Sequence, residues 1–200
     1  MKAVMKSVSP RICEKVANGN CTILVSKTAP KCGAPFKCYI YCTSAKPYLY
    51  KEANPPFELF FDSELYKGKG YDDGLFSGKV IGEFVCDWIT KITPHCDIDG
   101  WVNQYIHGYP AILGDNDCLS FNDMKAYLGN KKGYDWHISD LKIYDKPKEL
   151  SEFYRPCSYS GICYSCNRFR PNGTPNDKPN DFCDGEITRP PQSWFYVEEL

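Results

Sequence analysis

The sequence has no long hydrophobic run, which argues against a membrane-spanning protein and against a secreted protein with a signal peptide. No apolar stretch in its 200 residues approaches the ~20 that a membrane-spanning helix requires. The first ten residues also lack the hydrophobic segment that forms the centre of a secretory signal peptide. We therefore expect a cytoplasmic protein, in a reducing compartment and without membrane partners.

The sequence also has no internal repeat and no tract of low complexity. Repeat architectures are therefore not expected. A composition that is 42% hydrophobic and 15% aromatic argues against wholesale disorder, while 15 Gly and 15 Pro predict many turns and short elements. At this length we expect a single domain over residues 1–200.

Cysteine, by contrast, is abundant, with 12 residues in the chain. In a reducing compartment, cysteines are more often small core residues or metal ligands than partners in disulfides. We expect the same division here.

The first quarter of the chain is strongly basic. Residues 1–51 contain nine Lys or Arg and one acid, Glu14, although the whole chain has a net charge of −1. This asymmetry favours an anionic, phosphate-bearing partner for the basic part. The alternative is a solubilising lysine-rich face that acids balance elsewhere in the fold.

Short strands and helices are predicted in the first 45 residues. The pattern predicts a strand over 2–8, then a helix that starts at Pro10, with Ser9 as N-cap and Asn18-Gly19 as its end. Buried strands are predicted at 22–25 and 36–42, where Tyr39 and Tyr41 share one face and are expected to pack within the sheet.

The rest of the chain is less regular. Residues 46–77 are predicted to form an irregular insertion with a short strand or helical turn at 57–65, and residues 90–113 remain ambiguous. The other predicted elements are strands at 80–89, 136–145 and 192–198, a helix from Ser120 to Leu128, and a helical turn at 148–153. A bulge near Ser139-Asp140 would keep Trp136, Ile138, Leu141 and Ile143 facing inward. The fold class is α+β, with a strongly curved mixed sheet and two or three short helices.

Several segments together resemble the ASCH domain of the PUA-like superfamily. They read GNCTILVSK, FKCYIYCT, GKVIGEF, WHISDLKIYDKPKEL and PPQSWFYV, in that order. The resemblance covers residues 1–50, 78–92 and 134–200, and is strongest to short ASCH proteins of phages and Firmicutes. It implies a PUA-like β-barrel and a pocket for RNA, nucleosides or nucleotides.

The resemblance does not imply catalysis. ASCH proteins usually carry Lys, Glu (or Thr in the amidohydrolase branch) and Arg at the positions that are Cys21, Leu24 and Ser26 here. Leu24 has no nucleophilic atom, and no Lys stands at position 21 to activate one. Cys21 is a nucleophile only if a base lies beside it, and a small semi-buried strand residue is the simpler interpretation.

Polar and aromatic residues near the predicted strand ends are the candidates for ligand binding. Hydroxyl, amide and ammonium groups can contact phosphates or base edges, His137 can titrate near neutral pH, and Tyr48 lies where a base can stack. The predicted ligand-binding residues are Thr22, Ser26, Lys27, Thr43, Ser44, Lys46, Tyr48, His137 and Gln192. For each, an ordinary surface or sheet-packing role is the alternative.

The loop predicted at 155–188 contains a second candidate site. Cys157, Cys163, Cys166 and Cys183 follow a C-x5-C-x2-C-x16-C pattern in a Cys-rich C-terminal segment with few apolar residues. Four thiolates around Zn²⁺ would stabilise such a loop, and the closed shell would make the zinc structural. Free thiols or a disulfide are the alternatives.

These observations favour a non-catalytic binder of RNA or a nucleotide that uses a basic, hydroxyl-lined pocket. One alternative is a phage-type sponge or inhibitor that sequesters a nucleotide signal or blocks a host defence protein. A second alternative is an amidohydrolase-like enzyme on a modified nucleoside, with Cys21 or His137 in the chemistry.

Overall fold

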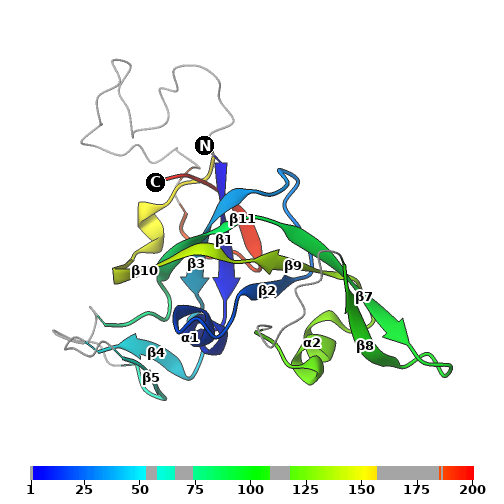
Figure 1. The fold of residues 1–200 in the computed structure, drawn as a ribbon. Helices are drawn as coiled ribbons and strands as arrows, with labels where there is room; N and C mark the ends of the chain where they lie inside the picture. Colours follow the sequence, from blue (N-terminus) through cyan, green and yellow to red (C-terminus); the bar gives the residue numbers. More distant parts are fainter. Residues whose placement is uncertain (1, 53–57, 66–73, 109–117, 157–184, 186) are drawn as a thin grey trace.

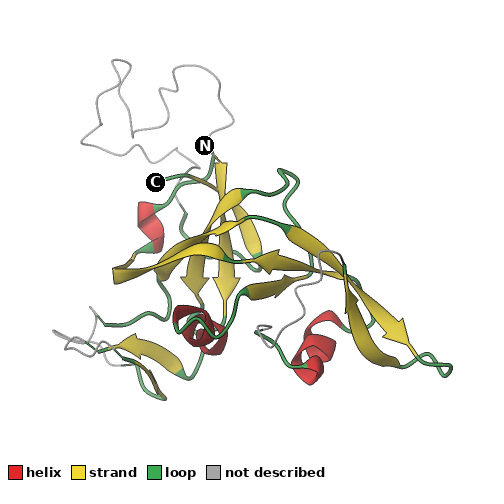
Figure 2. Ribbon diagram, in the orientation of Figure 1, coloured by secondary structure: helices red, strands yellow, loops and turns green. Residues whose placement is uncertain are grey.

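The structure is a computed structural model that describes residues 2–52, 58–65, 74–108, 118–156, 185 and 187–200. Strands predominate over helices in these parts of the chain (Figure 2). The five-stranded sheet has the order β10-β6-β3-β1-β11, the four-stranded sheet the order β2-β9-β7-β8, and β4 pairs with β5 alone. The strands are β1 Lys2–Val8, β2 Ile23–Ser26, β3 Phe36–Cys42, β4 Tyr48–Lys51, β5 Leu59–Asp62, β6 Val80–Cys86, β7 Ile89–Cys96, β8 Val102–His107, β9 Gly133–His137, β10 Ser139–Lys148 and β11 Trp194–Glu198. The helices are α1 Pro10–Ala17, α2 Phe121–Leu128 and the 3₁₀ turn η1 Leu150–Glu152.

The predicted strand–helix start of the chain is confirmed. β1 runs parallel to β3 and antiparallel to β11, so the sheet is mixed. α1 begins at Pro10, which has no N–H to leave unsatisfied at a helix start, and ends at Asn18. Gly19 follows with φ of +73°, a conformation that glycine adopts without a Cβ clash.

In the described residues, the main sheets are open and do not form the β-barrel that the ASCH resemblance implied. Two chain segments pass from one sheet to the other at a shared corner, β6 into β7 and β9 into β10. Pairing continues around this corner, because the His137 amide donates to the Trp88 carbonyl and the Ile138 amide to Thr22. In the described residues, no strand pairing joins the remaining edges of the two sheets.

The predicted bulge lies at this corner. Asp140 has φ of +47°, and the β10–β6 register shifts between Ser139 and Lys142. Trp136 and Ile138 are buried, and Leu141 and Ile143 pack against the same core, as predicted. The bulge therefore turns one predicted strand into two strands of different sheets.

Two regions are more regular than the sequence indicated. The described parts of 46–77 include the β4–β5 hairpin, and 90–113 includes most of β7 and all of β8. The β4–β5 hairpin lies apart from the main sheets, whereas β7 and β8 are the last two strands of the four-stranded sheet (Figure 1). Within the described residues, no helix has both the length and the apolar character needed to cross a membrane.

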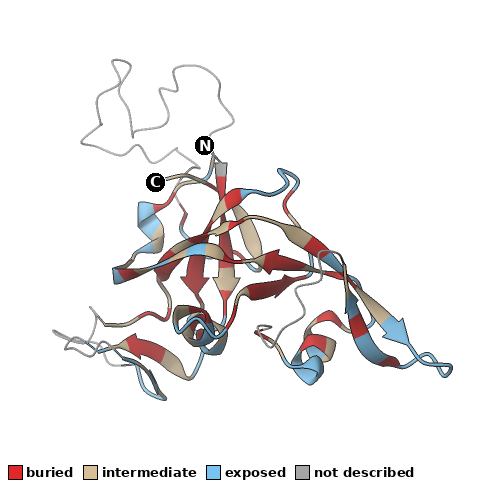
Figure 3. Ribbon diagram, viewed as in Figure 1, coloured by how far each residue is buried: buried red, intermediate tan, exposed pale blue. Residues whose placement is uncertain are grey.

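The core divides into three clusters, and the buried strands that carry them are the red segments of Figure 3. β1 separates two of the clusters, because Val4 and Val8 face the first and Ala3 and Met5 face the second. Tyr39 and Tyr41 are buried together in the second cluster, as predicted. The third cluster lies between the four-stranded sheet and α2 and includes Val25 and Leu128.

Candidate functional site

A cavity of about 220 Å³ lies where the first and third clusters meet. Its walls come from the end of β1, the start of α1, the middle of β2, and α2 with the residues before it. The lining residues are Lys6, Ser7, Val8, Ser9, Ile12, Leu24, Val25, Cys118, Leu119 and Tyr127. Lys6 is the only charged residue among them.

Lys6 is buried, with only 3% of its surface exposed. It stands between Val4 and Val8 on the face of β1 that points into the first cluster. Its ammonium lies 4.4 Å from the centroid of the Trp136 ring, close enough for a cation–π interaction. No carboxylate in the described parts of the chain pairs with it.

Burial changes the ionisation of Lys6. Removal of the ammonium from water lowers the pKa of Lys6 from 10.5 to about 8, although negative charge on Cys38 and Cys86 would act in the opposite direction. The group is therefore still mostly protonated at pH 7. A buried, mostly charged amine without a counter-ion is costly, and an anionic ligand in the cavity would offset that cost.

Two further lysines lie at the edge of the cavity. The Lys15 ammonium donates to the Cys118 carbonyl at 3.1 Å, and the Lys27 ammonium lies 4.7 Å from the Tyr127 ring centroid. Neither is paired with a carboxylate of the described residues. The surroundings of the cavity are therefore positive, in agreement with the basic character of residues 1–51.

Two buried polar atoms beside the cavity have no hydrogen-bond partner among the described residues, Oγ of Ser26 and Nε1 of Trp136. Leu24 on β2 is paired with Trp136 on β9, and Ser26 is two residues further along the same face. Buried polar groups usually have a partner, and the absence of one favours a ligand or ordered water at such positions.

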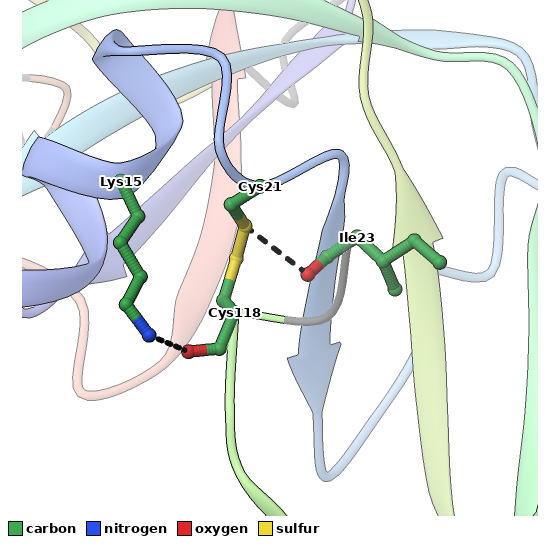
Figure 4. The surroundings of a disulfide bond; sticks show 4 residues. All are labelled: Lys15, Cys21, Ile23 and Cys118. Carbon is green, nitrogen blue, oxygen red and sulfur yellow. Dashed lines mark hydrogen bonds between the residues drawn. A yellow bond between two sulfur atoms is a disulfide. The ribbon is translucent and has the colours of Figure 1, made fainter. Parts of the chain in front are cut away.

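Cys21 and Cys118 form a disulfide beside the cavity, with Cα atoms 5.1 Å apart (Figure 4). This corrects the expectation that the cysteines would be core thiols or metal ligands. Residues 97 apart in sequence meet here only through the fold, so spacing did not indicate the bond. Cys21 is therefore not a free nucleophile, whereas Cys13, Cys38, Cys42 and Cys86 are buried free thiols, as predicted.

Some predicted ligand-binding residues lie near the cavity. Ser26 and Lys27 are close to it. Thr43 is also near, because its amide donates to the carbonyl of the lining residue Val8. Gln192 is exposed and follows Pro191, whose carbonyl accepts from the hydroxyl of the lining residue Ser7. Thr22 lies at the corner between the sheets, where its carbonyl accepts from Ile138.

The other predicted residues lie elsewhere. Ser44 and Lys46 are exposed on the segment that leads to β4, and Tyr48 belongs to the β4–β5 hairpin, on the opposite side of α1 from α2 in Figure 1. His137 lies opposite Ile23, on the face of β9 that points away from Trp136. Its Nδ1 is 2.6 Å from the Asp87 carboxylate and its ring stacks on Trp88, so its contacts are those of the sheet corner.

Sequence reasoning missed Lys6, Ser7, Ser9 and Tyr127 as candidate site residues. One signal was present, because the alternation of β1 places Lys6 on the same face as Val4 and Val8. A lysine on an otherwise apolar strand face is unusual, since this residue type is rarely buried. Tyr127 gave no such signal, because its proximity depends on how α2 packs.

The predicted zinc ligands Cys157, Cys163, Cys166 and Cys183 lie outside the described residues. Among the residues that are described, no group of three or more His, Cys, Asp or Glu side chains is arranged to hold a metal ion.

Comparison with known proteins gives the fold. No family model matches the sequence, and no curated protein matches it. A crystal structure of ZmASCH from Zymomonas mobilis, a variant with tyrosine replaced by phenylalanine, matches 100% of this chain and 92% of its own. The sequence identity is 14% and the TM-score 0.50. The chain has the fold of an ASCH domain.

Two further ZmASCH structures match 98% of this chain. A serine-to-alanine variant covers 89% of its own chain with 13% identity and a TM-score of 0.49, and a third structure covers 88% with 15% identity and a TM-score of 0.45. The match to the first structure bears out the expected ASCH fold. The comparisons do not show the expected similarity to phage and Firmicutes proteins.

The three positions at which ASCH proteins usually carry charge are all close to the cavity here. Leu24 lines it, Cys21 is bonded to the lining residue Cys118, and Ser26 is buried one residue beyond Val25. The positive charge inside the cavity comes instead from Lys6 on β1.

Proposed function

We propose that the protein binds a phosphate-bearing nucleotide, free or as one unit of an RNA strand, without transforming it. The observation that supports this most strongly is Lys6, a buried ammonium that lines a cavity and lacks a carboxylate partner among the described residues. A phosphate would form charge-assisted hydrogen bonds with this group. The hydroxyls of Ser9 and Tyr127, residues that also line the cavity, would complete its contacts.

The size of the cavity limits the ligand. Its volume of about 220 Å³ is below the ~300–1,000 Å³ of typical small-molecule pockets. Such a volume suits one phosphate with part of its nucleoside rather than a folded RNA element. An RNA strand would therefore insert one nucleotide and contact the surface lysines with its neighbours.

An enzyme on a modified nucleoside is the second candidate, and one observation favours it. A lysine whose pKa is lowered to about 8 by burial is close to the range that general bases use. In that case Lys6, rather than Cys21 or His137, would be the base. Binding without chemistry remains our proposal because Leu24 and Cys21 offer no free nucleophile beside it.

The test is to identify the ligand that freshly purified protein carries. Heat-denatured protein should release a nucleotide or RNA fragments detectable by mass spectrometry. Titration with ribonucleoside monophosphates and with a short single-stranded RNA should then give binding in the native protein. Affinity for RNA should fall steeply with salt over several phosphates, whereas a bound mononucleotide should respond weakly.

Matched variants locate the binding to the cavity. Lys6→Met should lower the affinity at least ~30-fold, while Lys31→Met, which removes an exposed lysine of the β2–β3 loop, should leave it nearly unchanged. Equal effects of the two substitutions would contradict the proposal. Turnover of an acetylated nucleoside that is lost in Lys6→Met would favour the enzyme.

A further inference from the structure

We infer that the Cys21–Cys118 disulfide is a redox modification site that controls the nucleotide cavity. The inference deepens the proposed function and rests on it. The disulfide joins two walls of the cavity that are 97 residues apart in sequence. Its reduction would release one wall from the other.

The position of the two cysteines supports this role. Cys21 precedes β2, whose Leu24 and Val25 line the cavity. Cys118 lines the cavity itself and is followed by Leu119, another lining residue, and by α2. One covalent bond therefore fixes the distance between the β2 wall and the segment that leads into α2 (Figure 4).

The contacts around the disulfide show which part would move. α2 is held by its own packing, since Met124 and Leu128 belong to the third cluster and Lys125 donates to the Val102 carbonyl at 3.0 Å. The main-chain contact of Cys118 is different, because its carbonyl accepts only from the Lys15 ammonium in the described structure. Reduction should therefore loosen residues 118–120, including the Ser120 cap of α2, and leave the rest of the helix in place.

Access to the disulfide is through the cavity. Cys21 and Cys118 are 1% and 2% exposed, so a protein-sized reductant cannot reach the sulfur atoms directly. A small dithiol can enter the cavity and attack Cys118. The attacking thiolate forms a mixed disulfide with Cys118 and releases Cys21 as a thiolate, which takes up a proton. The second thiol of the reductant then displaces Cys118, so two electrons and two protons pass to the protein and the dithiol is oxidised.

The buried thiols of the core do not offer a competing route. Burial raises the pKa of Cys13 and Cys38 well above the usual value, and raises that of Cys86 to about 12. These thiols are therefore almost entirely protonated at neutral pH, and a protonated thiol is a poor nucleophile. The disulfide should not exchange with them.

The same geometry couples ligand binding to the redox state. A ligand in the cavity would block the path of the dithiol to Cys118, and the intact disulfide would hold the wall that the ligand contacts. Because the intact disulfide holds that wall in place, the oxidised form should bind the ligand more tightly, and by thermodynamic linkage the bound ligand should favour the oxidised form.

The experiment compares oxidised and dithiothreitol-reduced full-length protein. Hydrogen exchange at Asp123 and Met124, whose amides donate to Ser120, should accelerate at least tenfold after reduction, while exchange in β3 should not change. Affinity for the four ribonucleoside monophosphates should fall at least tenfold in parallel. The Cys21→Ser/Cys118→Ser variant should behave as the reduced protein, and Cys32→Ser/Cys96→Ser, which removes two exposed free thiols, as the oxidised one.

The outcomes separate the two proposals. Unchanged exchange at Asp123 and Met124 after reduction would overturn the redox inference, as would free Cys21 and Cys118 thiols in protein purified without reductant. Accelerated exchange in a protein that binds no nucleotide in either form would support the redox-sensitive wall and overturn the proposed function.

Discussion

The lysines around the cavity differ in their surroundings from Lys37, which lies on the outer face of the five-stranded sheet. This outer face is the one that carries the second cluster. On the outer face, the Lys37 ammonium lies 3.6 Å from Glu83 and 3.4 Å from Glu199. Two lysines outside this sheet, Lys51 at the end of β4 and Lys79 just before β6, are also paired, with Asp145 and Glu149 respectively, although these acids are far away in sequence. Lys6, at the cavity, has an aromatic ring and no carboxylate among the described residues.

The ionisation of the two groups reflects this difference. Burial lowers the pKa of Lys6 to about 8. At Lys37 burial acts in the same direction, but the neighbouring Tyr39, Glu83 and Glu199 outweigh it and raise the pKa. The fold therefore neutralises some lysines of the basic segment internally, whereas Lys6, Lys15 and Lys27 at the cavity have no carboxylate partner among the described residues. Unpaired, buried charge indicates a binding site better than the number of charges does.

The largest expected effect is that of Lys6→Met on binding. Loss of a desolvated charge–phosphate contact costs ~2–5 kcal/mol, so nucleotide affinity should fall at least ~30-fold. Isothermal titration calorimetry with the native ligand measures this. A Lys6→Met protein that binds as the native protein does would show that the cavity is not the site.

A carboxylate inside the cavity should make it resemble the outer face. Leu24→Glu would place an acid beside Lys6, because both residues line the same cavity. We expect a loss of affinity of about tenfold or more, since the internal ion pair competes with the ligand. Leu24→Gln, which has the same shape without the charge, is the control and should bind more tightly than Leu24→Glu. Equal affinities would contradict an electrostatic role, provided that circular dichroism shows both variants folded.

The pH dependence of binding should reveal the low pKa of Lys6. If the ligand binds only the protonated amine, affinity should decrease about tenfold per pH unit above pH 8. A lysine with its ordinary pKa of 10.5 would give a constant affinity up to about pH 10. Calorimetric titrations between pH 7 and 10 distinguish the two cases.

The low pKa of Lys6 also affects stability. A rise in pH should weaken ligand binding but increase the contribution of Lys6 to the free energy of unfolding. The unfolded chain binds the Lys6 proton up to pH 10.5 and the folded chain only up to about pH 8. Between these values the unfolded state holds more protons, so the contribution of Lys6 to the free energy of unfolding rises with pH. Lys6→Met should therefore be more stable than the native protein at pH 7, by ~1–3 kcal/mol, and this advantage should shrink towards pH 10. Urea unfolding at several pH values measures it.

Lys37→Met should have a small effect. Its ion pairs are partly exposed, and such pairs contribute ~1 kcal/mol or less to the free energy of unfolding. Nucleotide affinity should remain within about twofold, because salt screens a charge outside the cavity. A large loss of affinity in Lys37→Met would place the ligand on the outer face rather than in the cavity.

The C-terminal cysteines should have the smallest effect on binding. We propose that Cys157, Cys163, Cys166 and Cys183 hold one structural zinc ion, because four thiolates close its coordination shell. Mass spectrometry of metal content should find about one zinc per chain, and Cys163→Ser/Cys166→Ser should remove it. Nucleotide affinity should not change. Zinc-free native protein would contradict this proposal.

The regular elements were predictable because their signals are local. Pro10 marks the start of α1 and Asn18-Gly19 its end, and Ser120 caps α2 by accepting from the Asp123 amide. The alternation of apolar residues identified β1 and β6. The β7–β8 hairpin was missed because Pro and Gly interrupt its pattern, and its pairing depends on β9 as well. The open arrangement of the sheets was not predictable either, since it depends on how the corner at Ser139-Asp140 bends.

The residues of the candidate site were also predictable only where their signals are local. The sequence by itself determined the strand–helix–strand start, the basic character of residues 1–51 and the replacement of the usual ASCH charges at Cys21, Leu24 and Ser26. Only the tertiary structure decided which lysines are paired with acids. It also decided that Lys6 faces a cavity and that Cys21 is bonded to Cys118. The physical reason is that a strand's alternation specifies two faces but not what covers each. Burial, and with it the pKa of Lys6, depends on residues that are distant along the chain.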